Sequence, residues 1–494
     1  MNPSLALFIY SCGVAGLFYL GRDKAARPSK ALWLPIIWIA LVASRSLSEW
    51  FGLTANRANV QLQGSPLDAA IFAVLETAAV AVLIRRSRRV RILLLANVPI
   101  LIFFLYCLIS VTWSYHPDVA FKRWIKAIGD LIMVLVVVTD REPVNALRLL
   151  ISRLGFVLLP ASLLLIKYFP VFGRGYSPDG MVENTGVTTN KNTLGVVLLV
   201  ITLGTLWQVV TLLRAKKRPG RRRHLIAQVT LLAFGVVLLE KANSQTSVAS
   251  FILGSIILVA TSLDIFQRRP ARVHALCLTI VLTGALMIYG GQAQVAHALG
   301  RQATLSGRTE IWAALIPTVP SSIVGAGFES YWISPSIEIV WRSLLAKGWW
   351  HPEVLVTEAH NGYIEVFLNL GWVGVCLIAN ILVSGYARAI KGFRRNPSAG
   401  ALMLAYIIAS AAYSFTEAGF RMLDPVWIFL LLAVVVSSGL ASGLFGGKVA
   451  KNVASPSGMS SKSYASNAAL PASEHGYAAR SELTLSQSIR GSII

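Results

Sequence analysis

The residues best suited to proton transfer and phosphate binding lie in the segment 302–375. Arg308 follows a glycine, and His360 with Asn361 comes just before an apolar run. A guanidinium can bind a phosphate or pyrophosphate through two hydrogen bonds, and an imidazole exchanges protons near neutral pH. Together they predict transfer chemistry on a phosphate-bearing substrate. Each also fits an ordinary role, because an arginine can be solvated and a histidine can pack at a helix N-terminus that Asn361 caps.

Lys191 and Asn192 form a second candidate site at the start of another apolar run. Backbone N–H groups at a helix N-terminus, together with a lysine, would attract an anion. Ordinary roles are again open, because Asn190 or Asn192 can cap the helix and Lys191 can extend toward the membrane surface.

Three further candidates for substrate contact are Ser244, Thr246 and Glu417. Ser244 and Thr246 lie in a polar turn too short for a generic linker, and Glu417 lies close to Arg421. An exposed pair of Glu417 with Arg421 would contribute little to stability.

Five tryptophans crowd the segment 291–361, which is interrupted by glycine-rich turns. Indole rings can stack on sugars and donate a hydrogen bond, but they also gather at membrane surfaces. Both interpretations are open for Trp312, the candidate closest to Arg308. The five are Trp312, Trp332, Trp341, Trp349 and Trp350.

These residues must be positioned by membrane helices. The 494-residue chain is 55% hydrophobic and only 14% charged, far from the composition of soluble proteins. Its formal charge of +23 comes mostly from short basic clusters between apolar runs, which favours membrane orientation over nucleic-acid binding. The four cysteines lie in apolar stretches without a zinc or disulfide pattern, and no nucleotide motif is visible. We expect neither a cofactor nor a metal.

The sequence predicts an all-α polytopic membrane protein of about 12–13 transmembrane helices. A helix needs roughly 20 apolar residues to cross a bilayer. The thirteen candidate segments are 4–20, 31–51, 67–84, 92–112, 124–139, 149–168, 192–213, 225–240, 247–264, 273–290, 362–385, 399–415 and 425–442.

Every second connection between these segments carries a Lys/Arg excess, which predicts the cytoplasmic side. Lys191, the 243–247 turn, Arg308, His360 and Glu417 then all fall on the opposite face. We expect a transmembrane domain over 1–445, a long external loop over 291–361 that contains the site, and a disordered cytoplasmic tail over 446–494.

Several motifs in this order resemble the O-antigen ligase and polymerase superfamily (Wzy/WaaL type). His360-Asn361 is followed after nine residues by Gly371 and then by Gly374. The ordered set is most similar to the ExoQ-type exopolysaccharide polymerases. The further matching elements are Ser306 to Trp312, Asn190 to Gly195, Ser244 to Ser247 and Thr112 to Pro117.

The resemblance implies a GT-C-like fold in the bacterial inner membrane with its active face in the periplasm. Such proteins polymerise oligosaccharide repeat units linked to undecaprenyl pyrophosphate, without metal or nucleotide. It implies that Arg308 holds the pyrophosphate and that His360 positions or deprotonates the acceptor. The family's basic residue in the Ser-x-Thr element is here Gln245, and its histidine before Lys-Asn is here Asn190. The second phosphate-binding cation is therefore open between Lys191 and Lys241.

The expected partners are the lipid-linked oligosaccharide, the growing polysaccharide acceptor, the bilayer, and chain-length regulator and export proteins, with no nucleic acid. One rival function is an O-antigen ligase that transfers the same donor to lipid A-core. A rival of another class is a transporter or flippase for polysaccharide precursors, which the ionisable residues Arg45, Glu76 and Asp130 within apolar segments keep open.

Overall fold

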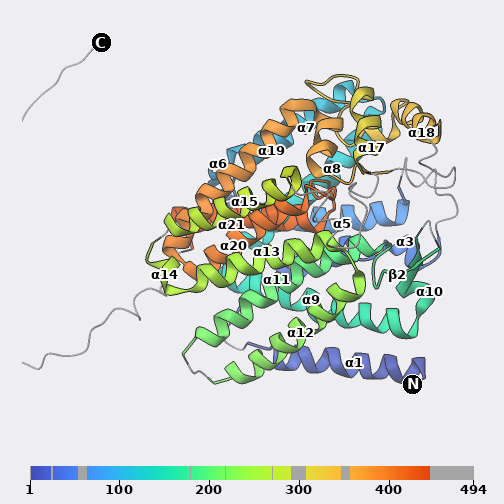
Figure 1. Cartoon of the computed structure of the whole chain (residues 1–494). Coiled ribbons are helices and arrows are strands. Elements are labelled where there is room, and N and C mark those ends of the chain that lie inside the picture. Colours follow the sequence, from blue (N-terminus) through green and yellow to red (C-terminus); the bar gives the residue numbers. More distant parts are fainter. Residues whose placement is uncertain are drawn as a thin grey trace, which may run out of the picture. The chain divides into compact units, whose positions relative to one another are not determined.

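The computed structural model confirms an all-α polytopic membrane protein (Figure 1). It describes residues 2–23, 26–53, 64–177, 180–216, 219–269, 271–290, 308–346 and 357–445, with only the helix backbone given for 281–290. The tail predicted for 446–494 lies outside these residues, as do parts of the predicted 291–361 loop, including Trp349 and Trp350.

The first half of the chain forms helices and one small antiparallel hairpin, in which Gly175 pairs with Glu183. In order, the elements are α1 (Pro3–Leu20), η1 (Lys30–Leu32), α2 (Trp33–Val42), α3 (Leu47–Trp50), α5 (Pro66–Ile84), α6 (Ser87–Ala96), α7 (Val98–Ser110), η2 (Val111–Trp113), α8 (Pro117–Val138), α9 (Pro143–Tyr168), α10 (Pro170–Gly173), β1 (Arg174–Tyr176) and β2 (Val182–Asn184).

In the described part of the second half, the regular elements are all helices, joined by loops such as 319–330, 357–361 and 414–424. Its elements are α11 (Lys191–Arg214), α12 (Arg221–Ala242), α13 (Gln245–Ser262), α14 (Asp264–Gln267), α15 (Ala271–Gly290), α17 (Arg308–Leu315), η3 (Ile316–Thr318), η4 (Tyr331–Ile333), α18 (Ser336–Ala346), α19 (Gly362–Arg395), α20 (Pro397–Tyr413) and α21 (Pro425–Ser442).

Each of the thirteen predicted spans falls on helical structure, but not every helix can cross a bilayer alone. Among the described residues, 8 helices are long and apolar enough, namely α1, α5, α9, α11, α12, α13, α19 and α21. A ninth span is possible if α6 and α7, which meet at 89°, count as one. The segment predicted as 31–51 is broken, because α2 ends at Val42 and α3 starts only at Leu47. The segment predicted as 124–139 falls on α8, which starts earlier, ends at Val138 and carries charges in its first turns.

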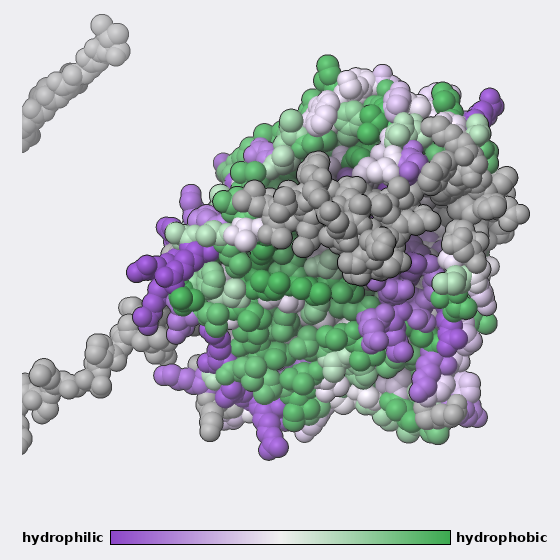
Figure 2. Space-filling view, viewed as in Figure 1, coloured by the Kyte–Doolittle hydropathy of each residue, from purple (hydrophilic) through white to green (hydrophobic). Residues whose placement is uncertain are grey.

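The centre of the bundle is α21, in which 89% of the residues are buried. It packs against α8, α11, α19 and α20 (Figure 1). The outer helices α12 and α13 expose large apolar residues such as Val236 and Ile252, as expected of side chains that face lipid. Figure 2 shows this apolar surface between hydrophilic residues at its two ends.

Helix α19 is broken at Gly371, where φ is 63° and ψ is −165°. The segment around Ile323 enters this break. Trp372 N–H donates to Ser322 at 2.9 Å, and Val373 N–H donates to Ile323 at 3.2 Å. A Cβ on Gly371 would lie 2.2 Å from the Ile323 oxygen, so only glycine fits both the conformation and the contact. The predicted glycine motif thus fixes the segment 321–327 against α19.

Candidate active site

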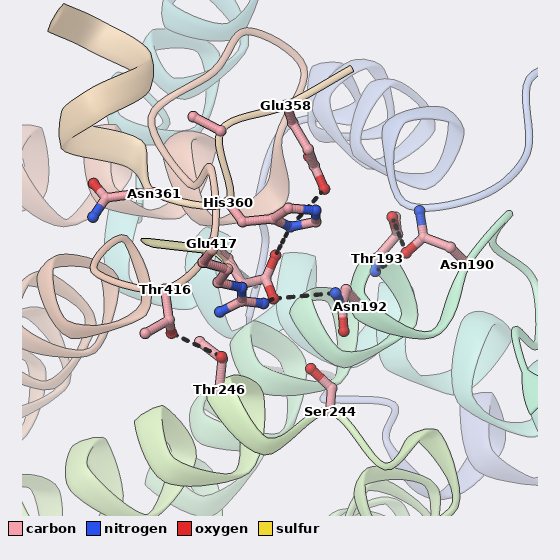
Figure 3. Close-up of polar contacts among 12 residues, drawn as sticks. Asn190, Asn192, Thr193, Ser244, Thr246, Glu358, His360, Asn361, Thr416 and Glu417 are labelled. Carbon is pink, nitrogen blue, oxygen red and sulfur yellow. Dashed lines mark hydrogen bonds and ion pairs between the residues drawn. The ribbon is translucent and has the colours of Figure 1, made fainter. Parts of the chain in front are cut away.

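Three of the predicted site residues meet around the buried carboxylate of a fourth, Glu417, which lies between α20 and α21 (Figure 3). Its Oε1 accepts hydrogen bonds from Arg308 Nη2 at 2.7 Å and from Asn192 Nδ2 at 3.1 Å. Its Oε2 lies 3.2 Å from His360 Nδ1. The Glu417 side chain is only 5% exposed. We call Asn192, Arg308, His360 and Glu417 the Glu417 cluster. Its members come from α11, α17 and two loops.

The backbone on the N-terminal side of His360 is fixed by two side chains. Ala359 N–H donates to Glu365 Oε2 at 3.0 Å, and the Ala359 carbonyl accepts from Trp312 Nε1 at 2.7 Å. His360 itself has a φ of 47°, in the left-handed region that β-carbon-bearing residues rarely adopt. The neighbours therefore hold a strained histidine. The indole N–H of Trp312 serves this loop, and its partly buried ring packs against the apolar cluster that includes Ile311 and Leu315.

Asn361 fixes the C-terminal side of the histidine. Its Oδ1 accepts from the backbone N–H groups of Tyr363 and Ile364 at 2.9 and 3.0 Å, which caps α19. Its Nδ2 donates to the Phe415 carbonyl at 2.9 Å, two residues before Glu417. The capping role considered from the sequence is the one that the side chain adopts, and it also ties the His360 loop to the Glu417 loop.

A second carboxylate, that of Glu358, faces the same imidazole nitrogen. Its Oε1 lies 3.2 Å from His360 Nδ1, and its Oε2 lies 3.7 Å from Arg421 Nη1. Arg421 lies 3.8 Å from Glu329 and 3.9 Å from Glu365. Sequence reasoning missed Glu358, whose one signal was its place two residues before His360. From the sequence, Arg421 is expected to be a surface partner of Glu417. In the structure it instead contacts Glu329, Glu358 and Glu365.

The charges around His360 favour its protonated form. Burial opposes the imidazolium, but the hydrogen bond to Glu417 and the charges of Glu358 and Glu417 outweigh burial and the repulsion from Arg308. The pKa of His360 therefore lies above its ordinary value. With both carboxylates at Nδ1, a neutral imidazole carries its proton there. Nε2 is then the nitrogen left to accept a proton.

Lys191, Thr246 and Ser244 have partners outside the Glu417 cluster. Lys191 Nζ forms an ion pair with Glu183 of β2 at 2.7 Å, so this cation already has a partner. Thr246 Oγ1 lies 2.8 Å from Thr416 Oγ1 and so holds the residue before Glu417 (Figure 3). Ser244 is 2% exposed and its Oγ lies 3.0 Å from Ser247 Oγ.

Glu358, His360 and Glu417 offer ligand atoms within 4.8 Å of one another, a donor set that can bind a metal ion. Arg308 and Asn192 both donate to Glu417 Oε1, and the guanidinium brings a fixed positive charge to that carboxylate. A cation bound there would meet the repulsion of this charge. The three side chains therefore fit an imidazole that is hydrogen-bonded to two carboxylates better than they fit a bound metal ion.

No family model matches the chain. A comparison with curated proteins finds the "Exopolysaccharide production protein ExoQ" of Rhizobium meliloti (strain 1021), 24% identical over 301 residues. This chain is similar to ExoQ. The match covers 58% of this chain, and it spans 64% of the length of ExoQ. The similarity agrees with the motif resemblance in the sequence.

Proposed function

We propose that this protein polymerises undecaprenyl-pyrophosphate-linked oligosaccharide repeat units into an exopolysaccharide at the periplasmic face of the bacterial inner membrane. The observation that carries the proposal is the Glu417 cluster, which joins an arginine and a histidine 52 residues apart in sequence through one carboxylate. The similarity to ExoQ, whose name assigns it to exopolysaccharide production, supports the same process.

The reaction is a single displacement at the anomeric carbon of the donor. Nε2 of His360 removes the proton of an acceptor hydroxyl, and the oxygen forms a bond to that carbon. The bond from the carbon to the diphosphate oxygen breaks with its electron pair, and undecaprenyl pyrophosphate leaves. One displacement inverts the configuration. The pyrophosphate is already a good leaving group, so the step needs no nucleotide.

Arg308 is suited to stabilise the leaving diphosphate. Glu417 contacts it through Nη2, and a guanidinium carries five N–H donors, so further donors remain for phosphate oxygens. The Arg308 side chain is 16% exposed, which places it at the edge of the buried cluster rather than inside it. Glu417 thus positions both the cation and the base.

Replacement of each residue in cells tests the proposal. Arg308→Ala and His360→Ala should abolish polymer while lipid-linked single repeat units accumulate. Matched controls are Arg342→Ala on α18, an arginine with a side chain 78% exposed, and His274→Ala on α15, an exposed histidine, and both should retain polymer. Full-length polymer in both site variants, with wild-type protein levels, would overturn the proposal.

Size analysis of the glycans made by these variants separates the rival functions. Loss of a ligase leaves normal-length polymer unattached to lipid A-core, whereas loss of a polymerase leaves single units. For the transporter, the relevant residue is Asp130, a carboxylate within an apolar segment. Its Oδ1 accepts from Trp38 Nε1 and its Oδ2 from Leu423 N–H, both at 2.9 Å. This carboxylate holds the loop that carries Glu417, a role that needs no transported ion.

A further inference from the structure

We propose that Glu358 and Arg421, a pair outside the Glu417 cluster, position His360 for catalysis and take no part in donor binding. We call these two residues the Arg421 arm. The proposal rests on the proposed function, because it assigns roles within that site. Of the charged residues around His360, Arg308 then binds the diphosphate, whereas Glu358 and Arg421 only hold the base.

The imidazole nitrogen Nδ1 is shared between two carboxylates. Glu358 Oε1 and Glu417 Oε2 both lie 3.2 Å from it (Figure 3). Each carboxylate has an arginine behind it, Arg421 at 3.7 Å from Glu358 and Arg308 at 2.7 Å from Glu417. Two acceptors on one nitrogen fix the proton at Nδ1 and the plane of the ring more firmly than one acceptor would.

The two arginines differ in how many carboxylates depend on them. Arg308 is paired with Glu417 alone among the described residues, so a diphosphate can take up its other donors. Arg421 lies within 3.9 Å of three carboxylates, those of Glu329, Glu358 and Glu365. A move of Arg421 toward a ligand would take this positive charge away from all three carboxylates, and the Glu365 and Glu329 side chains are only 2% and 7% exposed.

The backbone around Arg421 is also fixed. Met422 N–H donates to Glu329 Oε1 at 3.5 Å, and Leu423 N–H donates to the buried Asp130 at 2.9 Å. Asp424 then caps α21 through Val426 N–H at 2.7 Å. Arg421 is therefore a fixed point that neutralises three acids and aims one of them, Glu358, at the histidine.

This arrangement predicts how each charge affects His360. The charged groups that face the imidazole are Glu358 on its own loop, Glu417 between α20 and α21, and Arg308 on α17, with Arg421 behind Glu358. Removal of the Glu358 charge takes away one of the groups that stabilise the imidazolium, so the variant histidine loses its proton at lower pH.

The test compares Glu358→Gln and Arg421→Gln with Arg308→Lys in full-length protein in lipid nanodiscs. With defined lipid-linked repeat units, we expect both variants of the Arg421 arm to lower kcat about tenfold or more, the scale of a mispositioned general base, with a donor KM within about twofold of wild type. Arg308→Lys should instead raise the donor KM about tenfold, because lysine cannot form the bidentate contact. A donor KM raised equally by Glu358→Gln and Arg308→Lys would overturn the proposal.

A second readout does not need activity. The pH at which His360 titrates is measured by NMR of labelled histidine in the intact protein, with His360→Ala identifying the signal among the seven histidines. Glu358→Gln should lower this pH by about half a unit or more. An unchanged titration would overturn the Arg421 arm even if elongation were lost. If Glu358→Gln lowers the titration pH of His360 but the wild-type protein never elongates a chain, the proposed function alone is refuted.

Discussion

Arg308 donates a 2.7 Å hydrogen bond to Glu417, although the carboxylate that accepts it is 5% exposed. Such a pair is costly to break on one side, because the partner charge then stays buried. Glu417→Gln keeps the shape and the hydrogen-bonding capacity at Oε1 but removes the charge that faces His360. We expect kcat to fall on the order of tenfold to a hundredfold, with a donor KM within about twofold of wild type because the amide oxygen still accepts the hydrogen bond from Arg308.

Steady-state elongation with varied donor concentration measures this effect. Glu338→Gln on α18, a glutamate 63% exposed in a pair of its own with Arg342, is the matched control and should behave as wild type. Equal kcat in Glu417→Gln and in this control would show that Glu417 has no part in the reaction.

The raised pKa of His360 predicts the pH dependence of the reaction. A general base acts in its deprotonated form, so kcat should rise with pH and reach half of its maximum above the ordinary histidine pKa of 6.5. The stabilising contribution of the imidazolium should be fully present below 6.5 and be lost as the pH rises through the raised value. Elongation rates between about pH 5.5 and 9 test the first point, and a half-maximum below 6.5 would contradict it.

The charges around His360 predict that metal removal has little effect on elongation. A metal ion at Glu417 would meet the repulsion of the Arg308 guanidinium, so we expect a chelator to leave elongation within about twofold of the untreated rate. The measurement uses protein and substrates treated with EDTA. A loss that added Mg²⁺ or Mn²⁺ restores, and that Glu358→Gln no longer shows, would identify a metal centre at Glu358, His360 and Glu417 instead.

Gly371 predicts a loss of stability on substitution. Its φ of 63° and the close approach of Ile323 leave no room for a Cβ. We expect Gly371→Ala to destabilise the protein by about 1 to 3 kcal/mol and to impair elongation, because the segment 321–327 can no longer enter the break in α19. Thermal unfolding in detergent measures this.

Gly16→Ala in α1 is the matched control, because nothing lies within 4 Å of a Cβ built there. Alanine also favours a helix more than glycine does, so this variant should unfold at the wild-type temperature or slightly above it. If both substitutions lowered the unfolding temperature equally, the contact with Ile323 would not be the cause.

The helices and the residues of the Glu417 cluster could be predicted because their signals lie in short stretches of sequence. Apolar runs of spanning length and alternating basic connections indicate the helices and place Arg308 and Glu417 at the same end. The break at Gly371 could not be predicted, because a glycine in an apolar run gives no sign that a segment 50 residues earlier enters it. The partners of Asp130 in α2 and in the loop before α21 depend on the same kind of long-range contact.

Glu358 shows the same limit at the site. A glutamate in a tryptophan-rich segment has no pattern that distinguishes it, and its role depends on the left-handed conformation of His360 and on Arg421 from another loop. Ser244 is the reverse case. The sequence places it with the polar candidates, yet it packs against Gly195 of α11, where a Cβ would lie 2.7 Å from its own.

The central claim is that Arg308 and His360 act on one diphosphate-linked donor, and elongation by the purified protein tests it most directly. Nanodiscs that contain the protein and defined undecaprenyl-pyrophosphate-linked repeat units should yield a ladder of lengthening glycans and release undecaprenyl pyrophosphate in equal molar amount. His360→Ala and Arg308→Ala should each lower the rate about a hundredfold or more. A ladder formed at the wild-type rate by both variants, or no chain growth by a folded wild-type protein, would contradict the account.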